Sequence, residues 1–531
     1  MIPTITLNAL ERLLNSRFKE GFLSLKDLPL PSTFKDMHRA TQRIIAAIKN
    51  GEKITIIGDY DVDGVTSTTL MKLFFEEIAY DIEWIIPNRF KDGYGLSSHI
   101  IPRIVGTDLA ITVDNGISAV VAAKLCKEEG IDLIITDHHL LAPELPDAYA
   151  IIDQKQEDCN FPYSEVCGAQ IAWYLIASLK NELNIKINMI EYMELVAVAI
   201  IADMMPLQHI NRVMVIKGIE ALNSSKRPAI RAFFEHAKKE SLSSEDIGFF
   251  LAPLLNSAGR MEDASFAVDF LASTNIYDAR VRLEKLINFN TLRKTTEQEI
   301  TEKAMSQVNK DDKVVVVYGK KWHEGVVGIV AARLSRHHEK PCIILSENEE
   351  GVLKGSGRSY GSCDLFGIVN NTREYLDKFG GHKAAIGLSI KKDKIESFKM
   401  KVEKNYALSS YIKEELDPDI VGELHFSNIS FDLTNLMKKF EPYGQGNSTP
   451  KFISSNVEIL QVDSMGKNAE HLRFSFNQNG IVMQGVKFKT KEIFKIGQKV
   501  DIIYILNENS FRGNITLQLI IDKVTIKNLI Y

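Results

Sequence analysis

At 531 residues, the chain is well beyond the size at which a single hydrophobic core keeps growing, so we expect several domains. Hydrophobic residues make up 45% and charged residues 25% of it, which excludes an intrinsically disordered protein. Lys and Arg number 64 against 69 Asp and Glu, a net charge of -5, which excludes a protein that coats nucleic acid through its overall charge. A polyanion such as a nucleic acid would therefore have to bind at particular sites on the protein and not to its overall charge.

The N-terminal residues show no sign of export or membrane insertion. Residues 1–18 include Glu11 and Arg12, so they resemble neither a signal peptide nor an anchor, and no stretch has membrane-spanning length. The cysteines have no CxxC spacing and are too few for a disulfide framework, which favours a cytoplasmic location and no membrane partner. They are Cys126, Cys159, Cys167, Cys342 and Cys363.

The first half of the chain is predicted to be a helical segment, residues 1–50, followed by an α/β domain, residues 51–215. In the latter, short apolar runs alternate with helical patterns, as in a doubly wound parallel sheet with crossover helices. The predicted strands are residues 54–57, 84–86, 109–113 and 133–135, and the predicted helices are residues 65–77 and 118–129.

The second half is predicted to begin with a helical region, residues 216–310. Its last part, residues 278–308, has few apolar positions and is typical of a long polar helix that bridges two domains. A Gly-rich mixed α/β domain is expected over residues 311–410. From 411 to 531, apolar and polar residues alternate in the runs 472–476, 502–506 and 515–521, which favours a small antiparallel barrel.

Carboxylates directly follow three of the predicted strands. The segments are Gly58-Asp59-Tyr60-Asp61-Val62-Asp63-Gly64, Asp114-Asn115-Gly116 and Asp137-His138-His139. Because ligands bind beyond the carboxyl ends of the strands in an open parallel sheet, we expect these side chains to meet in one crevice. So many like charges repel one another without cations, and oxygen and imidazole ligands suit Mn²⁺ or Mg²⁺. We therefore predict a divalent-cation site that can hold two ions.

Similar acidic patterns also occur in calcium-binding loops and in ordinary turns. Asp-x-Asp-x-Asp-Gly opens an EF-hand loop, but that loop needs Glu where the chain has Leu70, and a helix where it has an Ile-rich strand. A single acid after a strand is more often a helix cap or turn residue, but three together with a His pair are hard to explain in this way. A structural role for the His pair stays open. His138 and His139 are adjacent and point in different directions, so at most one should bind a given ion directly.

These motifs resemble those of the DHH phosphoesterase superfamily, named for the triplet Asp137-His138-His139. Ala202-Asp203-Met204-Met205-Pro206-Leu207 is similar to its fourth metal-binding motif. The resemblance implies a two-metal catalytic domain over residues 51–215, with Asp114 bridging the ions and Asp59 in support. Asp137, His138 and His139 are expected to be catalytic, with His139 facing the substrate phosphate. Without the family resemblance, Asp203 would be interpreted as a carboxylate that ends an apolar helix. The implied ligands are Asp61, Asp63, Asp114, His138 and Asp203.

Over nearly the whole chain, the resemblance is to the RecJ family of that superfamily, which degrades single-stranded DNA from the 5′ end. It implies a DHHA1 domain over residues 311–410 and an OB-like barrel over residues 411–531. Ser448 stands where that family usually has Pro, a difference that concerns a turn and not the chemistry. The further matching segments are Asn256-Ser257-Ala258-Gly259-Arg260, Trp322-His323-Glu324-Gly325-Val326-Val327-Gly328-Ile329-Val330, Gly355-Ser356-Gly357-Arg358-Ser359, Gly380-Gly381-His382 and Glu441-Pro442-Tyr443-Gly444-Gln445-Gly446-Asn447.

We therefore expect a 5′-to-3′ exonuclease that hydrolyses single-stranded DNA to nucleoside 5′-monophosphates in DNA repair and recombination. Two divalent ions, Mn²⁺ or Mg²⁺, can activate water and stabilise an in-line displacement at phosphorus. No nucleophilic Ser or Cys is required, and no GxSxG or P-loop motif competes. Single-strand-binding protein and a helicase are expected as partners from the resemblance alone.

Residues outside the acid cluster are expected to hold the strand. A terminal 5′-phosphate suits Ser356 and Arg358 in a Gly-rich turn, and Arg89 is expected to close that pocket from the catalytic side, unless it is an ordinary surface residue. Tyr94 is expected to stack on a base. The expected substrate-binding residues are Arg89, Tyr94, Arg260, Ser356, Arg358 and His382, of which His382 is also expected to be catalytic, although a Gly-Gly-His turn can be tight backbone alone.

Two alternative functions remain open. One is a phosphodiesterase for short oligonucleotides or cyclic dinucleotides, although such relatives lack the extended helical region and the barrel. The other is a non-catalytic DNA-binding replication scaffold, against which the complete acid set argues. The barrel supports strand binding only weakly, because basic residues there are more often a solvated face than a binding track. Those residues are Lys451, Lys467, His471, Arg473 and Lys487.

Overall fold

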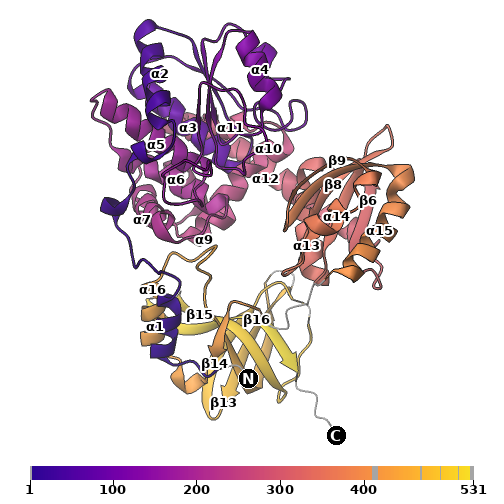
Figure 1. The fold of residues 1–531 in the computed structure, drawn as a ribbon. Coiled ribbons are helices and arrows are strands. Elements are labelled where there is room, and N and C mark those ends of the chain that lie inside the picture. Colours follow the sequence, from indigo (N-terminus) through magenta and orange to yellow (C-terminus); the bar gives the residue numbers. More distant parts are fainter. Residues whose placement is uncertain (1–2, 410–416, 467–468, 491, 512, 527–531) are drawn as a thin grey trace.

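The computed structural model describes residues 3–409, 417–466, 469–490, 492–511 and 513–526. Figure 1 shows an α/β domain, a smaller mixed domain beside it and a β-barrel on one side of both. The long helix α12, Ile276–Met305, runs from the first domain to the second. Within the described ranges, no helix has both the length and the apolar content needed to cross a bilayer.

The sheet of the α/β domain is parallel, as predicted, with the strand order β2-β1-β3-β4-β5. The order reverses between β1 and β3, the point at which open α/β sheets bind ligands. The prediction omitted β5, whose three residues are too short a run to distinguish from a loop. The strands are β1 Ile54–Ile57, β2 Glu83–Ile85, β3 Leu109–Val113, β4 Asp132–Thr136 and β5 Ala150–Ile152.

Helices cover both faces of this sheet, so the doubly wound prediction is confirmed. One face packs against α2, α3, α5 and α6, and the other against α4 and η3. The helix α3 is buried on nearly all sides, and the hydroxyls of Thr66, Thr68 and Thr69 donate to carbonyls in the preceding turn, so these three buried polar groups have partners. The bounds are α2 Met37–Asn50, α3 Val62–Glu77, η3 Ile101–Arg103, α4 Val120–Glu128, α5 Gly168–Glu182 and α6 Met189–Ala202.

A helical layer extends the core of this domain and leads into α12. Leu283 and Leu286, in the first half of α12, belong to that core, whereas Ile300 and Ala304, near its end, belong to the core of the mixed domain. The predicted bridging helix is therefore confirmed. The other helices of this layer are α7 His209–Asn223, α8 Pro228–Ala237, α9 Ser244–Asp246, η4 Ile247–Leu251, α10 Ala252–Met261 and α11 Ser265–Leu271.

The mixed domain has a sheet of order β6-β7-β8-β10-β9, in which only β6 and β7 are parallel. The helices α14 and α15 cover one face. On the other face α13 packs on β7 and β8, while Gly387 in β10 and Gly380 in β9 stay exposed. The elements are β6 Val315–Lys320, α13 Glu324–His338, β7 Cys342–Glu347, β8 Val352–Arg358, α14 Leu365–Asn370, η5 Arg373–Tyr375, β9 Leu376–His382, β10 Ala385–Lys391, η6 Lys392–Lys394 and α15 Ile395–Leu408.

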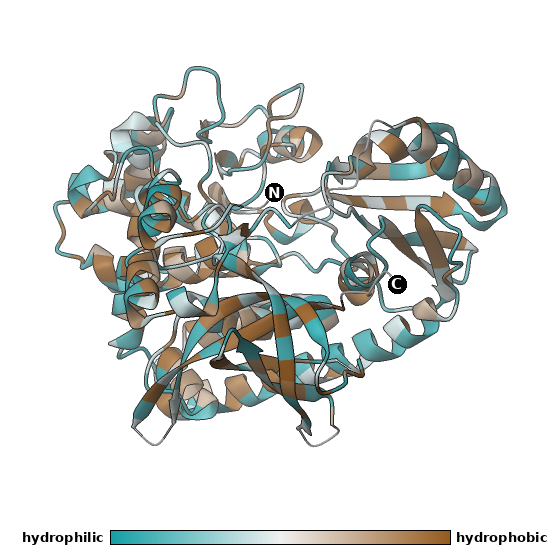
Figure 2. Cartoon of the chain, turned by 90° about the horizontal axis from the view of Figure 1, so that it is seen from below, coloured by the Kyte–Doolittle hydropathy of each residue, from teal (hydrophilic) through white to brown (hydrophobic). Residues whose placement is uncertain are grey.

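The last domain is a barrel in the order β12-β13-β14-β16-β15, closed because β12 pairs with both β13 and β15. The expectation of purely antiparallel pairing was wrong, since β14 pairs with β16, and β11 with β12, in parallel. A period of two shows which residues face the core but not which way the neighbouring strand runs. Figure 2 shows the resulting alternation of hydrophobic and hydrophilic residues along the strands. The elements are β11 Ile420–Glu423, η7 Phe426–Asn428, α16 Phe431–Lys438, β12 Lys451–Met465, β13 His471–Gln478, β14 Ile481–Lys487, β15 Lys499–Phe511 and β16 Asn514–Ile526.

The first 50 residues are helical, as expected, but divide between two domains. Leu10 and Leu14 of α1, Leu7–Asn15, are buried in the core of the barrel, where the amide of Ile5 also donates to the carbonyl of Glu423 at 2.8 Å. The helix α2 instead packs in the α/β domain. Short 3-10 turns, η1 Leu25–Asp27 and η2 Pro31–Thr33, connect the two helices.

Candidate active site

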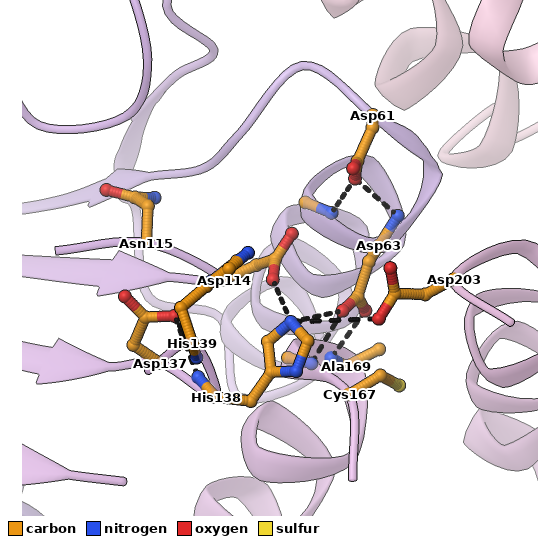
Figure 3. Close-up of polar contacts among 12 residues, drawn as sticks. Asp61, Asp63, Asp114, Asn115, Asp137, His138, His139, Cys167, Ala169 and Asp203 are labelled. Atoms are coloured by element: carbon orange, nitrogen blue, oxygen red, sulfur yellow. Dashed lines mark hydrogen bonds and ion pairs between the residues drawn. The ribbon is translucent and has the colours of Figure 1, made fainter. Parts of the chain in front are cut away.

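The acidic segments of the sequence come together at the carboxyl edge of the first sheet. Asp59 follows β1, Asp114 follows β3 and the Asp137-His138-His139 triplet follows β4. Asp203 joins them from the end of α6. Figure 3 shows His138 pointing toward the carboxylates of Asp63, Asp114 and Asp203.

The imidazole of His138 lies at the centre of the cluster. Its Nε2 is 3.1 Å from Asp114 Oδ1, 3.6 Å from Asp63 Oδ2 and 3.7 Å from Asp203 Oδ2. Three sets of side chains have donor atoms within 4.8 Å of one another, as the ligands of one ion require. These sets are Asp63, His138 and Asp203; Asp59, Asp61 and Asp114; and Asp114, His138 and His139.

Backbone amides fix the orientation of two of the acids. Asp61 caps α3, and its Oδ1 accepts from the amides of Asp63 at 3.0 Å and Gly64 at 3.2 Å. The carboxylate of Asp63 accepts from the first amides of α5, Gly168 at 2.6 Å and Ala169 at 2.8 Å. A Cβ at Gly168 would lie 2.5 Å from Asp114 Cβ, so only glycine lets α5 approach this closely.

Asp137 has a different position from the other acids of the cluster. Its Oδ1 accepts from the amides of His138 at 2.7 Å and His139 at 3.1 Å and lies 2.7 Å from His139 Nδ1. Its Oδ2 accepts from the amide of Ile117 at 2.9 Å. With both oxygens engaged, Asp137 supports the loop and orients His139, which is itself half exposed beside the Tyr94 hydroxyl.

Burial and mutual repulsion disfavour full ionisation of this cluster. Burial, reinforced by neighbouring carboxylates, raises the pKa of Asp59 and Asp114 well above the ordinary value and that of Asp203 to about 8. Burial opposes protonation of His139, but its hydrogen bond to Asp137 prevails and raises the pKa to about 9.

The unsatisfied atoms of the cluster fit divalent cations. Asp59 Oδ1, Asp114 Oδ1 and Asp203 Oδ2 are buried without a hydrogen-bond partner, which is costly unless a cation lies against them. The donors are carboxylate oxygens and imidazole nitrogen, the set that hard and borderline divalent ions prefer. The residues present therefore suit Mn²⁺ or Mg²⁺.

Two adjoining cavities lead from the acid cluster to the mixed domain. The first, of about 220 Å³, is lined by Asp59, Asp61 and Arg260, and the second, of about 250 Å³, by Ser356 and other residues of the mixed domain. They adjoin each other at Tyr60, Arg89 and Tyr94, which line both.

Arginines gather around these cavities. The guanidinium of Arg89 stacks on the ring of Tyr60 at 4.5 Å, and Arg358 donates to Ser356 Oγ at 2.6 Å. Burial, followed by the charge of Arg89, lowers the pKa of Arg260 to about 10 and also lowers that of Arg358. Such a concentration of positive charge suits a phosphate group.

The exposed side of β8, β10 and β9, here called the sheet face, continues from the second cavity. Strand pairing places Arg358, Ala385 and His382 in one row across it, and Ser356, Gly387 and Gly380 in the next. A Cβ at Gly387 or Gly380 would meet no atom within 4 Å, so the face is flat and open there. A nucleic-acid backbone can approach such a surface closely.

The structure thus unites most of the predicted site residues. The predicted metal-binding residues meet in one cluster, Arg89 and Tyr94 line both cavities, and Arg260 and Ser356 line one each. His382 lies exposed at the end of β9 and lines neither cavity.

The predicted basic track of the barrel is largely engaged within the protein. Lys451 pairs with Asp417 at 2.6 Å and Asp522 at 2.8 Å, and Lys487 is mostly buried and donates to the carbonyl of Asp522. Arg473 is exposed, while His471 accepts from the amide of Lys489 and is half-buried. Lys467 lies outside the described residues.

The prediction missed two buried polar residues at or beside the site. Buried Asn115 accepts from the amide of Leu96 and donates to the carbonyls of Ile57 and Val113, so it joins the ends of β1 and β3 to the loop that carries Arg89. Its place in Asp114-Asn115-Gly116 could have indicated it. Asp153 follows β5, and burial raises its pKa to about 7. Recognising β5 as a strand would have revealed it.

Domain comparisons divide the chain in the same way as the structure. Residues 53–200 match the N-terminal domain of the DHH family, residues 311–408 the DHHA1 domain, and residues 420–523 the RecJ OB domain.

Relatives are similar over most of the chain. The single-stranded-DNA-specific exonuclease RecJ of Escherichia coli is 33% identical over 92% of this chain and 90% of its own, and that of Bacillus subtilis 33% over 95% and 65%. A RecJ structure with Mn²⁺ from Thermus thermophilus, 24% identical, has the same fold with a TM-score of 0.79, covering 93% of this chain and 72% of that one. Another exonuclease RecJ bound to manganese is 27% identical, with a TM-score of 0.63 over 73% and 96%.

Proposed function

The chain belongs to the RecJ family, and we propose that it is a single-stranded-DNA-specific exonuclease that hydrolyses the strand from its 5′ end, with divalent cations, to nucleoside 5′-monophosphates. One observation carries this proposal. Asp59, Asp114 and Asp203 have buried, unpartnered oxygens in one cluster, and Asp59 lines a cavity that adjoins, at Arg89, a second cavity lined by Ser356 of another domain.

We propose that two ions, Mn²⁺ or Mg²⁺, are held by these acids and His138. Asp114, a member of two of the candidate ligand sets, would bridge the two metal ions, and Asp59 would support their binding. When bound, the ions supply Lewis-acid activation of water and neutralise charge on the phosphodiester. The proposed ligands are Asp61, Asp63, Asp114, His138 and Asp203.

His139 is proposed to contact the scissile phosphate. Its Nδ1 is held by Asp137, while its Nε2 lies 3.3 Å from the Tyr94 hydroxyl, beside the cavity. An imidazole fixed in this way can donate to a phosphate oxygen without a change of rotamer. Asp137 would act through His139, as a positioning residue.

The second cavity is proposed to determine that cleavage starts at the 5′ end of the strand. Arg89 and Ser356 line this cavity, and Arg358 lies beside it through its hydrogen bond to Ser356 Oγ. Together they would bind a terminal 5′-phosphate, because Arg forks and a hydroxyl suit its extra charge. The phosphodiester that follows would then lie in the first cavity, beside the acids and Arg260. His382 would contact the strand from the sheet face, and Tyr94 would stack on a base.

The protein is proposed to act in DNA repair and recombination. The nuclease relatives support this role, and the free cysteines suit a reducing compartment such as the cytoplasm. Single-strand-binding protein and a helicase are proposed as partners, because they would generate and present the single strand.

The proposal is tested by supplying Mn²⁺ with a 5′-phosphorylated single strand, a hairpin duplex and a cyclic dinucleotide in parallel, using strands labelled at either end. We expect rapid release of labelled mononucleotide from the 5′ label and slow release from the 3′ label. Loss of the cyclic dinucleotide alone would contradict the proposal, and so would loss of the 3′ label first. The same reactions with EDTA test metal dependence.

A further inference from the structure

The segment that carries Asp203, residues 203–208, here called the ligand turn, is held by contacts from outside the acid cluster. One set comes from residues 439–448, here called the docking loop, which lead into the barrel. The carbonyl of Gln445 accepts from the amide of Leu207 at 2.7 Å, and that of Gly446 accepts from Gln208 Nε2 at 2.8 Å. A Cβ at Gly446 would lie 3.1 Å from that of Pro206, so the two segments are in close contact.

Asn211, in the first turn of α7, holds the ligand turn from the opposite side. Its Nδ2 donates to the carbonyls of Pro206 at 3.0 Å and Glu165 at 2.7 Å, and its Oδ1 accepts from Gln170 Nε2 at 2.9 Å. Both amide side chains are buried. Buried amides whose donors and acceptors are all engaged define one geometry, because any rearrangement leaves a polar group unsatisfied.

Gln170 connects this contact to the second acid. Its Oε1 accepts from the amide of Cys167 at 3.0 Å at the start of α5. The next two amides, Gly168 and Ala169, hold the carboxylate of Asp63. A continuous path of hydrogen bonds therefore leads from the ligand turn of Asp203 to the helix end that orients Asp63.

The neighbour of Asn211 ties the same helix turn to the barrel. Arg212 donates to the carbonyls of Lys439 at 3.2 Å and Glu441 at 2.7 Å, and its guanidinium lies 4.1 Å from the ring centroid of Phe22. The first turn of α7 thus contacts both the ligand turn and the docking loop.

We propose that Asn211 and Gln170 are positioning residues that fix the separation of Asp63 and Asp203 and thereby build the ion site that these acids share with His138. The docking loop braces the ligand turn from the other side. This inference rests on the metal centre of the proposed function. Neither residue touches the reacting atoms; each acts through backbone that carries or orients a ligand.

The test uses the full chain with Mn²⁺ alone, and measures the affinity and number of bound ions by calorimetry and electron paramagnetic resonance. Asn211→Ala removes the contacts to Pro206 and Gln170, and Gln170→Met removes the amide while keeping a neutral side chain of similar length. Asn223→Ala is the matched control, because Asn223 lies at the other end of α7 and joins Leu242 through both of its amide atoms, at 2.8 and 3.1 Å. The melting temperature of each variant shows whether it folds.

We expect Asn211→Ala and Gln170→Met to weaken binding of one Mn²⁺ by about 10–100-fold, the usual effect of losing a residue that orients a ligand, while Asn223→Ala binds as the wild type does. Cleavage should lose kcat with little change in KM for the strand, and excess Mn²⁺ should restore part of it. Equal affinities in all four proteins would overturn this inference alone. A wild-type chain that binds no Mn²⁺ would overturn the metal centre and the inference with it.

Discussion

The acid cluster and the sheet face are both proposed to contact the DNA strand, but they differ in whether their polar atoms have partners within the protein. In the cluster, buried carboxylates crowd around His138 with unpartnered oxygens. On the sheet face, glycines leave an open surface, and the polar atoms of Ser356 and Arg358 already have partners within the protein. The carboxylates of the cluster therefore need cations to neutralise their unpartnered oxygens. The sheet face is already formed without a ligand, and needs only a ligand whose shape matches it.

This difference indicates which step each region controls. A site completed only by ions should govern the chemical step, because removing one ligand changes the charge that stabilises the transition state. A preformed face should govern binding and the choice of strand end. The cavities that share Tyr60, Arg89 and Tyr94 connect the two regions.

The largest effect is expected from His138→Ala. Loss of the central imidazole should lower kcat by roughly 10³-fold, which corresponds to about 4 kcal/mol of transition-state stabilisation, while single-strand binding stays measurable. The measurement is single-turnover cleavage with a separate binding assay. His337→Ala, on the exposed end of α13, serves as control, and turnover unaltered in the His138 variant would remove the cluster from the mechanism.

A smaller effect is expected from Arg358→Met. Losing a charge-assisted contact to the terminal phosphate should raise KM for a 5′-phosphorylated strand by about 10–100-fold, with little change for a 5′-hydroxyl strand. Arg336→Met, an exposed arginine of α13, is the control. If KM rises equally for both strands, the sheet face does not recognise the terminal phosphate.

Gly387→Val probes the flatness of the sheet face. The Cβ of the new side chain meets no atom within 4 Å, so folding should be little changed, but the side chain should raise KM about tenfold, as expected from the loss of roughly 1.4 kcal/mol of binding. Titration of a labelled strand and the melting temperature of the variant measure the two quantities. A lower melting temperature with unchanged KM would mean that the strand does not cross this row.

The smallest effect concerns stability without metal. Burial, with the charges of Asp63 and Asp61, raises the pKa of Asp203 from 3.8 to about 8. A group with a higher pKa in the folded state contributes stability that is complete below its unfolded value and is lost as the pH rises through its folded value. In EDTA, the melting temperature of the wild type should therefore fall between about pH 6 and pH 8. This fall should exceed that of Asp203→Asn by roughly 2 °C.

Ser356→Ala is the control for this comparison, since the sheet face carries no such strain. Parallel melting curves for wild type and Asp203→Asn would show that the acids do not repel one another in the metal-free protein. Mn²⁺ should reverse the slope of the wild type, because it binds the deprotonated carboxylates.

The sequence predicted the acid cluster better than the sheet face, for a physical reason. Asp59, Asp114 and Asp137 follow buried strands, so parallel pairing alone brings them to one edge. Asp203 required the family resemblance, because an acid at the end of an apolar helix has no distinctive local pattern.

The residues of the sheet face come together only through strand register. Gly380 and Gly387 are row partners because β9 pairs with β10 in one register, which no local pattern specifies. The same limit applies to Asn211 and Gln170, which lie 41 residues apart along the chain and meet through tertiary packing alone. Strand direction in the barrel was mispredicted for the related reason that alternation records burial and not orientation.

The placement of α1 in the barrel affects the order in which the chain can assemble during synthesis. Ile5, Leu10 and Leu14 leave the ribosome before the α/β domain, yet the core that buries them is made from barrel strands that emerge only after both other domains. Until then these apolar side chains lack their final partners, and closing so long a loop is expected to be slow. Deleting α1 should therefore destabilise the barrel, which is distant in sequence, and leave the α/β domain that follows α1 able to fold.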